Sequence, residues 1–492
     1  MSAKEDSHSM LAWLPELVYA AGRFQSGRAL VCDASGLILK LVDAAELTDE
    51  KRVNLPRRAL LPGMINAHSH AFQRVIRGRT EYRTSNHADS FWTWREMMYS
   101  AATRLTPEDV YDASRMAFLE MALSGITAVG EFHYLHHAPD GKPYEDPNLL
   151  AKEVIRAASD VGIRIALLRV AYARSGFQTE PNPKQTRFIE RDAHAYLKNL
   201  EALIKSVRSP SVSDGSAVHP ALPNGRASDT TWIGVAPHSV RAVPLEYLRN
   251  VVTHANAHDL KIHMHVAEQP AEVSACVEEY RRTPVALLQS EGLLGDRFTA
   301  VHAIHVTPKA IPAFAKTGAM VCACPTTERN LGDGVVPADE YLKHDVSICL
   351  GTDSHTQIDL LEDARELEYH LRLQKLERAV LASKTQVSSL KSQDLAALLF
   401  DCATVNGARS IGAPGGALEV GKPADFFTVD LDDPAVAGAS DADLLASIVF
   451  SSSRAAVREV VVGGKPIVSE GQHLIQEEVI ERFNDLQKRL WE

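Results

Sequence analysis

Residues 61–79, LPGMINAHSHAFQRVIRGR, contain two histidines two positions apart, directly after an apolar run. This run predicts a buried strand entered through the turn at Pro62 and Gly63. Side chains alternate between the two faces of a strand, so His68 and His70 point the same way. Two imidazoles at the end of a strand can bind a metal ion, or hydrogen bonds can satisfy each of them. The choice depends on whether the rest of the chain supplies further ligands.

Apolar, strand-like runs recur along the middle of the chain. The eight runs span 60–70, 126–137, 163–173, 232–240, 260–269, 297–306, 318–334 and 346–355. Amphipathic segments such as 107–125 and 147–162 separate them, with apolar residues spaced three to four apart. This alternation predicts an α/β fold, a parallel (β/α)8 barrel. Polar residues follow the strands, at the end where barrel enzymes have their active sites.

The two ends of the chain have a different pattern. Residues 1–60 and 411–492 contain short alternating runs and turn signals, which predict two β segments that pair into one small β-sandwich domain. The barrel is then expected over 61–410. The last stretch, 477–492, predicts a terminal amphipathic helix. Residues 206–231 are rich in Ser, Pro, Gly and Asn, and predict a long loop inserted in the barrel.

Composition restricts the class of protein. The chain has 492 residues, 45% of them hydrophobic, and a formal net charge of −11, which argues against nucleic acid or an anionic membrane as partner. No apolar run approaches the roughly 18–20 residues of a membrane helix, and the N-terminus lacks the pattern of a signal peptide. The six cysteines are scattered, and Cys322 and Cys324 fit a buried strand. We therefore expect a cytoplasmic protein.

Further metal-ligand candidates follow the later strands. Strand five supplies HMHVAEQ (263–269), strand six VHAIH (301–305) and strand eight TDSH (352–355). A catalytic zinc site uses about three or four nitrogen and oxygen ligands and leaves one position for water. Such a site would be completed by His68, His70, one of the two histidines of strand five, and Asp353. Ligands of this kind suit Zn²⁺ and also Fe²⁺.

Seven blocks occur in a characteristic order: AHSHAFQR, FWTWREMMY, GEFHYLHH, APHSVRAV, HVAEQ, TERNLGDG and GTDSH. With them the chain resembles the amidohydrolase superfamily, in its mononuclear deaminase branch, and within it the formimidoylglutamate deiminases. The resemblance covers nearly the whole chain, and 206–231 is an insertion in the family pattern. It implies a TIM-like metal-dependent hydrolase barrel, one Zn²⁺ per chain with Fe²⁺ as the alternative, and hydrolysis of N-formimidoyl-L-glutamate to N-formyl-L-glutamate and ammonia during histidine degradation. We also expect a homodimer.

The resemblance implies roles for individual residues. The family's histidine ligand lies three residues before the glutamate, which selects His265 over His263. In strand six, the match to VHA selects His302 over His305. Glu268 is then the proton shuttle, His302 orients the nucleophile, and Asp353 holds the water's other hydrogen. The expected metal ligands are His68, His70, His265 and Asp353.

The substrate is a small dicarboxylate amidine, so an acidic protein needs local cations to bind it. Arginine suits carboxylates because its planar guanidinium donates two parallel hydrogen bonds. The family match assigns this role to Arg95 and Arg241, helped by Gln73, Tyr134 and His238.

Two alternatives compete with this interpretation. A related deaminase would act on a nucleobase, a nucleoside or a compound of the S-adenosylhomocysteine type, or a relative could be a chlorohydrolase. A pocket for such ring substrates would bind them by aromatic stacking, not by a pair of arginines. A non-enzymatic scaffold could also retain the barrel without its site, but the complete ligand set and Glu268 argue against that.

Overall fold

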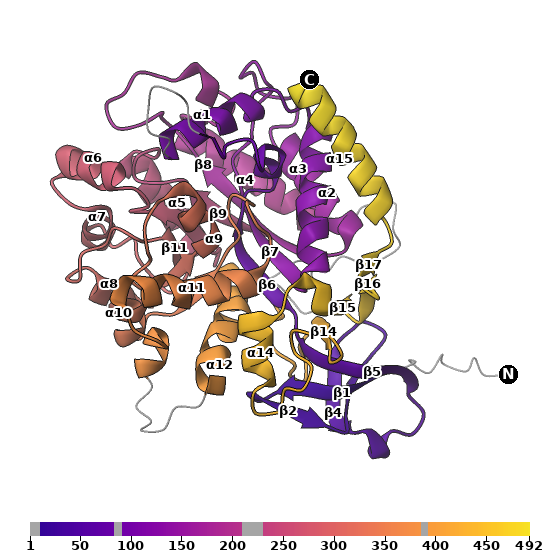
Figure 1. Cartoon of the computed structure of the whole chain (residues 1–492). Coiled ribbons are helices and arrows are strands. Elements are labelled where there is room, and N and C mark those ends of the chain that lie inside the picture. The colour runs from indigo at the N-terminus through magenta and orange to yellow at the C-terminus, as the bar shows by residue number, and fades with distance from the viewer. Residues whose placement is uncertain (1–9, 83–90, 209–229, 385–391) are drawn as a thin grey trace.

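The computed structural model describes residues 10–82, 91–208, 230–384 and 392–492 (Figure 1). Eight parallel strands form one sheet in the order β13-β12-β11-β10-β9-β8-β7-β6. Each strand lies within or almost within one predicted apolar run: β6 (Met64–Ser69), β7 (Ile126–His133), β8 (Arg164–Ala171), β9 (Thr231–Pro237), β10 (Ile262–Val266), β11 (Phe298–His302), β12 (Met320–Ala323) and β13 (Ile348–Leu350). The predicted barrel is confirmed.

The barrel is nearly closed where its first strand meets the segment after its last. Ser69 and Asp353 form a parallel bridge. The Asp353 amide donates to the His68 carbonyl at 3.0 Å, and the His70 amide donates to the Asp353 carbonyl at 3.1 Å. At Gly351 a Cβ atom would lie 2.7 Å from the His68 Cβ, so only glycine allows this approach. The seam therefore joins the H-x-H segment to Asp353.

Helices surround the barrel strands (Figure 1). The predicted amphipathic segments correspond to α2 (Pro107–Leu123) and α3 (Leu149–Val161). The other helices before β14 are α1 (Phe91–Ala102), α4 (Ala193–Arg208), α5 (Leu245–Ala257), α6 (Pro270–Tyr280), α7 (Pro284–Ser290), α8 (Ile311–Thr317), α9 (Pro325–Leu331), α10 (Ala338–Lys343), α11 (Leu360–Lys375), α12 (Ser392–Ala403) and α13 (Val405–Ile411). None of the helices in the described part of the chain has the length and hydropathy needed to cross a membrane.

Both ends of the chain contribute to a second, mixed sheet, as predicted. Its strands are β1 (Leu11–Ala20), β2 (Arg23–Ser26), β3 (Arg28–Cys32), β4 (Ile38–Asp43), β5 (Lys51–Pro62), β14 (Phe426–Asp430), β15 (Val457–Val462), β16 (Lys465–Ser469) and β17 (Gln472–His473). Strand β5 is the link, because it pairs in parallel with β1 and antiparallel with β14. It then continues almost directly into the first barrel strand.

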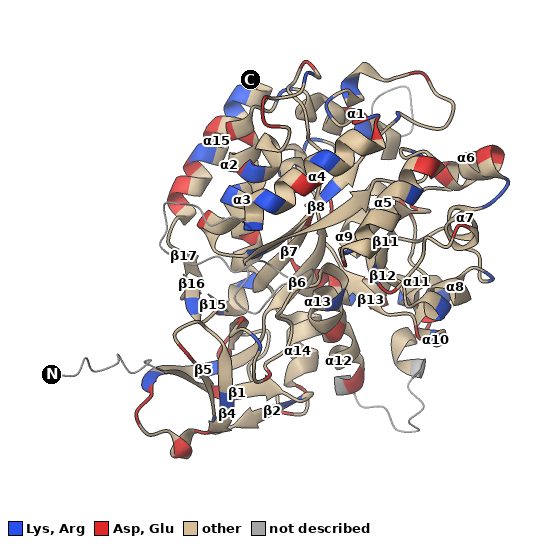
Figure 2. Cartoon of the chain, turned by 180° about the vertical axis from the view of Figure 1, so that it is seen from behind, with Lys and Arg blue, Asp and Glu red and all other residues tan. Residues whose placement is uncertain are grey.

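The C-terminal part also contains α14 (Leu444–Ser451) and α15 (Gln476–Trp491). The predicted terminal helix is thus present, and it runs along α2 of the barrel (Figure 1). Arg115 on α2 pairs with Glu478 at 2.7 Å, and Arg482 pairs with Asp112 at 2.8 Å. Charged residues of both signs lie along α15 (Figure 2).

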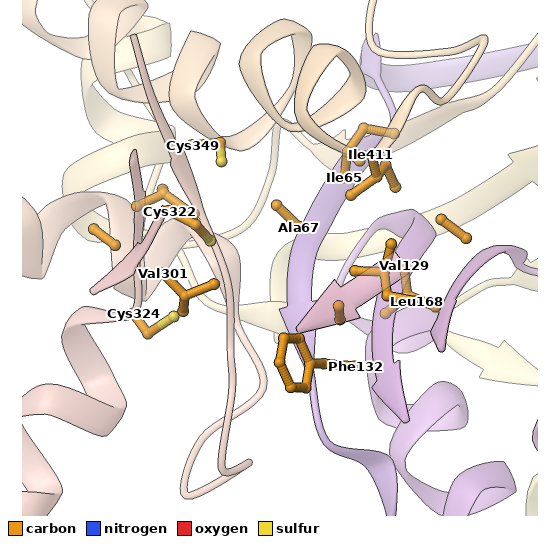
Figure 3. Close-up of a cluster of buried hydrophobic side chains, with 14 of the residues drawn as sticks. Ile65, Ala67, Val129, Phe132, Leu168, Val301, Cys322, Cys324, Cys349 and Ile411 are labelled. Atoms are coloured by element: carbon orange, nitrogen blue, oxygen red, sulfur yellow. The ribbon is translucent and has the colours of Figure 1, made fainter. Parts of the chain in front are cut away.

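Apolar side chains of several barrel strands meet Ile411 of α13 in a buried cluster (Figure 3). All six cysteines are free and buried, and Cys322 and Cys324 lie in and directly after β12, as expected for strand positions. The predicted loop 206–231 lies mostly outside the described residues: α4 continues to Arg208, and β9 begins at Thr231.

Candidate active site

Four buried side chains converge at the carboxyl end of the barrel strands: His68, His70, His265 and Asp353. One ligand atom from each lies within 4.8 Å of all the others. The Nε2 atoms of His70 and His265 are 3.4 Å apart. Asp353 Oδ1 lies 3.3 Å from Nε2 of His68 and 3.2 Å from Nε2 of His70. The structure therefore brings together the four side chains predicted as metal ligands.

Backbone carbonyls orient two of these imidazoles. Nδ1 of His70 lies 3.0 Å from the Phe132 carbonyl, and Nδ1 of His265 lies 3.1 Å from the His238 carbonyl. A carbonyl only accepts, so each Nδ1 carries the proton and each Nε2 presents a lone pair to the centre. Nδ1 of His68 is buried without a hydrogen-bond partner among the described residues, and its Nε2 faces Asp353. Facing lone pairs beside a carboxylate repel one another, and a divalent cation relieves that repulsion.

The protonation states also suit a metal ion. Burial lowers the pKa of His68 to about 3 and holds that of His265 well below its usual value. Burial opposes the charge of Asp353, but the neighbouring imidazoles keep its pKa well below the ordinary range. Histidine binds a metal as neutral imidazole and aspartate binds it as ionised carboxylate, and these are the states that the pKa shifts favour here.

Two of the site residues have an unusual backbone conformation. His302 has φ of 66° and Asp353 has φ of 44°, in the left-handed region that residues other than glycine rarely adopt. Such conformations persist only where surrounding contacts impose them. Here they turn both side chains at the strand ends toward the same centre.

A group of carboxylates surrounds His302. Glu268 Oε1 lies 3.7 Å from its Nε2, and Glu328 Oε1 lies 3.2 Å from its Nδ1. Burial opposes protonation of His302, but Glu268, Glu328 and Asp353 together raise its pKa to about 10. Burial also raises the pKa of Glu268. A carboxyl group with a raised pKa is a stronger proton acceptor than an ordinary one, and it can give the proton back.

A pocket of about 490 Å³, part of it open to solvent, leads to this centre. All five predicted substrate-binding residues line it, together with all the other predicted site residues except His68. The lining is completed by aromatic and apolar side chains: Phe91, Trp94, Met98, Tyr99, Tyr172, Phe188 and Leu331.

The two arginines provide unused hydrogen-bond donors. Arg95 packs on Trp92, with its Cζ 4.4 Å from the ring centroid. Among the described residues, no acceptor contacts Nε or Nη1 of Arg95 or Nη1 of Arg241, although these atoms are buried. Burial and the nearby Arg241 guanidinium lower the pKa of Arg95. An anion in the pocket would satisfy both cations.

The histidines that were not selected have other contacts. His263 is buried, and its Nε2 lies 3.2 Å from the Ser410 carbonyl. His305 Nε2 lies 2.8 Å from the Asp333 carbonyl. Neither belongs to the cluster of four.

Sequence reasoning missed Tyr99, Tyr172 and Glu328. Tyr99 lies four residues after Arg95, and this spacing puts both on one face of α1, a signal that could have found it. Tyr172 directly follows β8 at the active end of the barrel. Glu328 is part of the block TERNLGDG, and the family resemblance assigns its glutamate no role.

An eight-stranded parallel barrel with a buried cluster of three histidines and an aspartate, beside a carboxyl group of raised pKa, defines a metal-dependent hydrolase. The sequence matches the amidohydrolase family over residues 59–467. The chain belongs to the amidohydrolase family, and it is a hydrolase that acts on carbon–nitrogen bonds.

Three relatives illustrate the comparison. The chain is 37% identical to the formimidoylglutamate deiminase of Pseudomonas aeruginosa over 86% of its own length and 88% of that protein. It is 26% identical to a 5-methylthioadenosine/S-adenosylhomocysteine deaminase of Haloarcula marismortui, over 93% of its length and 90% of that protein. The crystal structure of an amidohydrolase from Brucella melitensis is 31% identical, with a TM-score of 0.85, covering 98% of this chain and all of that one.

Proposed function

We propose that the protein hydrolyses N-formimidoyl-L-glutamate to N-formyl-L-glutamate and ammonia. The observation that carries the proposal is a pair of arginines, Arg95 and Arg241, in the same pocket as the four metal ligands. The substrate combines two carboxylates with one amidine carbon, so its site needs cations and a hydrolytic centre together. The likeness to the Pseudomonas aeruginosa deiminase supports the same substrate.

His68, His70, His265 and Asp353 would hold one zinc ion, with iron(II) as the alternative. When bound, such an ion supplies hydroxide near neutral pH, because it lowers the pKa of water to about 7. The buried imidazoles would hold that ion at the carboxyl ends of the barrel strands.

Glu268 moves the protons. Its carboxylate takes one proton from the attacking water and passes it to the nitrogen of the amidinium, whose bond to carbon then breaks and releases ammonia. The proton that remains on the attacking oxygen passes to Asp353 as the formyl carbonyl forms. Its position beside His302, and its raised pKa, suit this exchange.

His302 and Asp353 orient the nucleophile. His302 Nε2 lies 3.7 Å from Glu268 and 3.8 Å from Asp353 Oδ2, so it points between the two carboxylates. There it donates a hydrogen bond to the oxygen that attacks the amidine carbon, and it stabilises the tetrahedral intermediate. Asp353 accepts the other hydrogen of the water.

Arg95 and Arg241 each bind a substrate carboxylate. Gln73, Tyr134 and His238 lie beside the part of the substrate between its carboxylates and its amidine. Burial and the nearby Arg241 hold the pKa of His238 well below its usual value, so His238 is neutral there. By the family resemblance the reaction belongs to histidine degradation, in a cytoplasmic homodimer.

An ammonia-release assay tests the proposal. The purified enzyme is offered N-formimidoyl-L-glutamate, N-formimidoyl-L-aspartate, adenosine, S-adenosylhomocysteine and guanine. We expect turnover of the glutamate derivative above all others. Turnover of S-adenosylhomocysteine or adenosine without turnover of the diacid would favour the second candidate, a nucleoside deaminase, which the relative from Haloarcula marismortui supports.

Variants of the arginines test the pocket. Arg95→Met and Arg241→Met each leave one substrate charge desolvated and unpaired, which costs about 2–5 kcal/mol, or roughly 30- to several-thousand-fold in kcat/KM. Arg249→Met is the control, because Arg249 forms an ion pair with Glu291 outside the pocket. If both pocket variants keep the wild-type kcat/KM while binding metal, the dicarboxylate pocket is wrong.

A further inference from the structure

Two tyrosines share one amide group at the wall of the pocket. Gln185 Nε2 donates to the Tyr99 hydroxyl at 2.6 Å and to the Tyr172 hydroxyl at 2.7 Å. All three side chains are buried, and both tyrosines line the pocket with the two arginines. They come from three separate segments: α1, the residue after β8, and the 3-10 turn Pro183–Gln185.

The hydrogen bonds at these two hydroxyls leave one hydroxyl hydrogen without an acceptor among the described residues. A primary amide nitrogen has two hydrogens and accepts nothing, so Gln185 uses both on the two phenol oxygens. Among the described residues, no carbonyl or carboxylate accepts a proton from either phenol, and the remaining contact is between the two hydroxyls themselves. One proton can lie between them. At least one is therefore left without an acceptor among the described residues, on a side chain that lines the pocket.

The surroundings of the pair favour a carboxylate. Arg95 Cζ lies 5.4 Å from the Tyr99 ring centroid, and the Tyr172 ring centroid lies 4.6 Å from that of His238. Tyr134 differs, because its hydroxyl accepts from Gln73 at 2.7 Å and contacts Met98 Sδ at 3.7 Å, which uses its proton. A phenol proton beside two guanidinium groups adds a further donor to an anion site.

We infer that Tyr99 and Tyr172, oriented by Gln185, complete the carboxylate-binding part of the pocket and donate a phenolic hydrogen bond to the carboxylate held by Arg95 or Arg241. This assignment rests on the proposed function. It makes the tyrosines specificity-determining residues and Gln185 a positioning residue, because its amide occupies both phenol oxygens as acceptors and so leaves a phenol proton to donate to the substrate.

The test uses Tyr99→Phe, Tyr172→Phe and the double variant, with N-formimidoyl-L-glutamate and its two mono-amides as substrates. A hydrogen bond to a charged group contributes about 10- to 150-fold, so the double variant should lose about that factor in kcat/KM. Most of the loss should appear in KM, because the contact is present in the ground state as well as the transition state. It should shrink for the mono-amide that lacks the matching carboxylate. A merely structural role would affect all three substrates equally.

Gln185→Glu provides a second, sharper measurement. The carboxylate would accept both phenol protons and add a negative charge, so KM for the diacid should rise beyond that of the double variant. Tyr196→Phe is the control, because that buried hydroxyl donates to the Arg169 carbonyl at 2.7 Å, away from the pocket. Its KM should stay at the wild-type value.

The outcomes separate the two proposals. If the wild type turns over the diacid and the double variant keeps its KM, the tyrosine assignment is overturned and the proposed function stands. If the wild type has no turnover, calorimetry with N-formyl-L-glutamate decides. If the wild type binds N-formyl-L-glutamate and the double variant binds it more weakly, the tyrosine assignment is supported and the proposed function is not. If the wild type does not bind it, both proposals are overturned.

Discussion

At the scale of single residues, the strand β10 carries two histidines on one face, and they have different surroundings. His265, nearer the carboxyl end, lies among the other ligands, whereas His263 contacts the Ser410 carbonyl. Glu268 follows three residues after His265 and lies beside His302. One short segment thus carries both a predicted metal ligand and the proposed proton shuttle.

The two histidines form a matched pair of variants. His265→Ala should lose the bound metal and all activity, because it removes one of the four proposed ligands. His263→Ala should keep about one metal ion per chain, measured by elemental analysis of the purified proteins. Exhaustive chelation of the wild type should abolish activity, and added zinc should restore it. Two metals per chain, or metal loss only in the His263 variant, would contradict the ligand assignment.

Glu268→Gln separates chemistry from binding. The amide keeps the shape of the side chain but cannot accept the proton, a contribution of about 10²–10⁴-fold in rate. We expect kcat to fall by that factor, with metal content and substrate affinity retained, as measured by steady-state kinetics and elemental analysis. A fall of less than about tenfold would exclude Glu268 as the shuttle.

At the scale of elements, α2 illustrates how local sequence secures a barrel helix. Thr106 accepts from the Asp109 amide, and the Asp109 side chain accepts from the Thr106 amide, a capping box followed by Pro107. The same Asp109 pairs with Arg489 of α15 at 2.8 Å. Asp109 therefore both caps the N-terminus of α2 and binds the terminal helix.

Thr106→Ala removes the cap at its side chain. The free energy of unfolding should fall by about 1 kcal/mol, measured by urea denaturation, since an amide at the helix start loses its acceptor. Thr253→Ala, at an exposed site on α5, is the control and should stay within about 0.5 kcal/mol of wild type. Equal stabilities of the two variants would contradict the capping role.

At the scale of the whole molecule, one buried ion pair joins the barrel to the mixed sheet. Arg164, the first residue of β8, contacts Asp425 through Nε at 2.7 Å and Nη2 at 3.1 Å, and both side chains are at most 3% exposed. Asp425 also accepts from the Gly463 amide at 2.6 Å. The pair lies at the amino end of β8, and the active site lies at the carboxyl ends of the barrel strands.

Arg164→Met leaves the buried Asp425 without its cation. We expect the free energy of unfolding to fall by about 3–5 kcal/mol, because removing one partner of a buried ion pair leaves the other charge buried and uncompensated. Arg57→Met breaks the exposed pairs with Glu16 and Asp432 and should cost less than about 1 kcal/mol. Below the melting temperature the kcat of Arg164→Met should match wild type. A stability loss as small as that of Arg57→Met would show that the pair does not couple the two parts.

Sequence alone determined the features that depend on short-range order. Strand and helix periods, read over ten to twenty residues, were sufficient for the barrel and for the terminal β segments, because burial imposes those periods locally. The spacing of His68 and His70 put both on one strand face. Motif order, which the family resemblance interpreted, indicated His265, Glu268 and Asp353 at the ends of later strands. All of them lie at one centre in the structure.

Only the tertiary structure decided which side chains from distant segments meet. Gln185 contacts Tyr99 and Tyr172 because α1, β8 and a turn after β8 converge, and no local pattern encodes that convergence. Glu328, on α9 after β12, reaches His302 at the end of the neighbouring strand β11. Arg164 and Asp425 are 261 residues apart. Such contacts depend on how the barrel closes and on where each helix packs. Both depend on burying apolar surface from many distant segments at once, so no single stretch of the chain determines them.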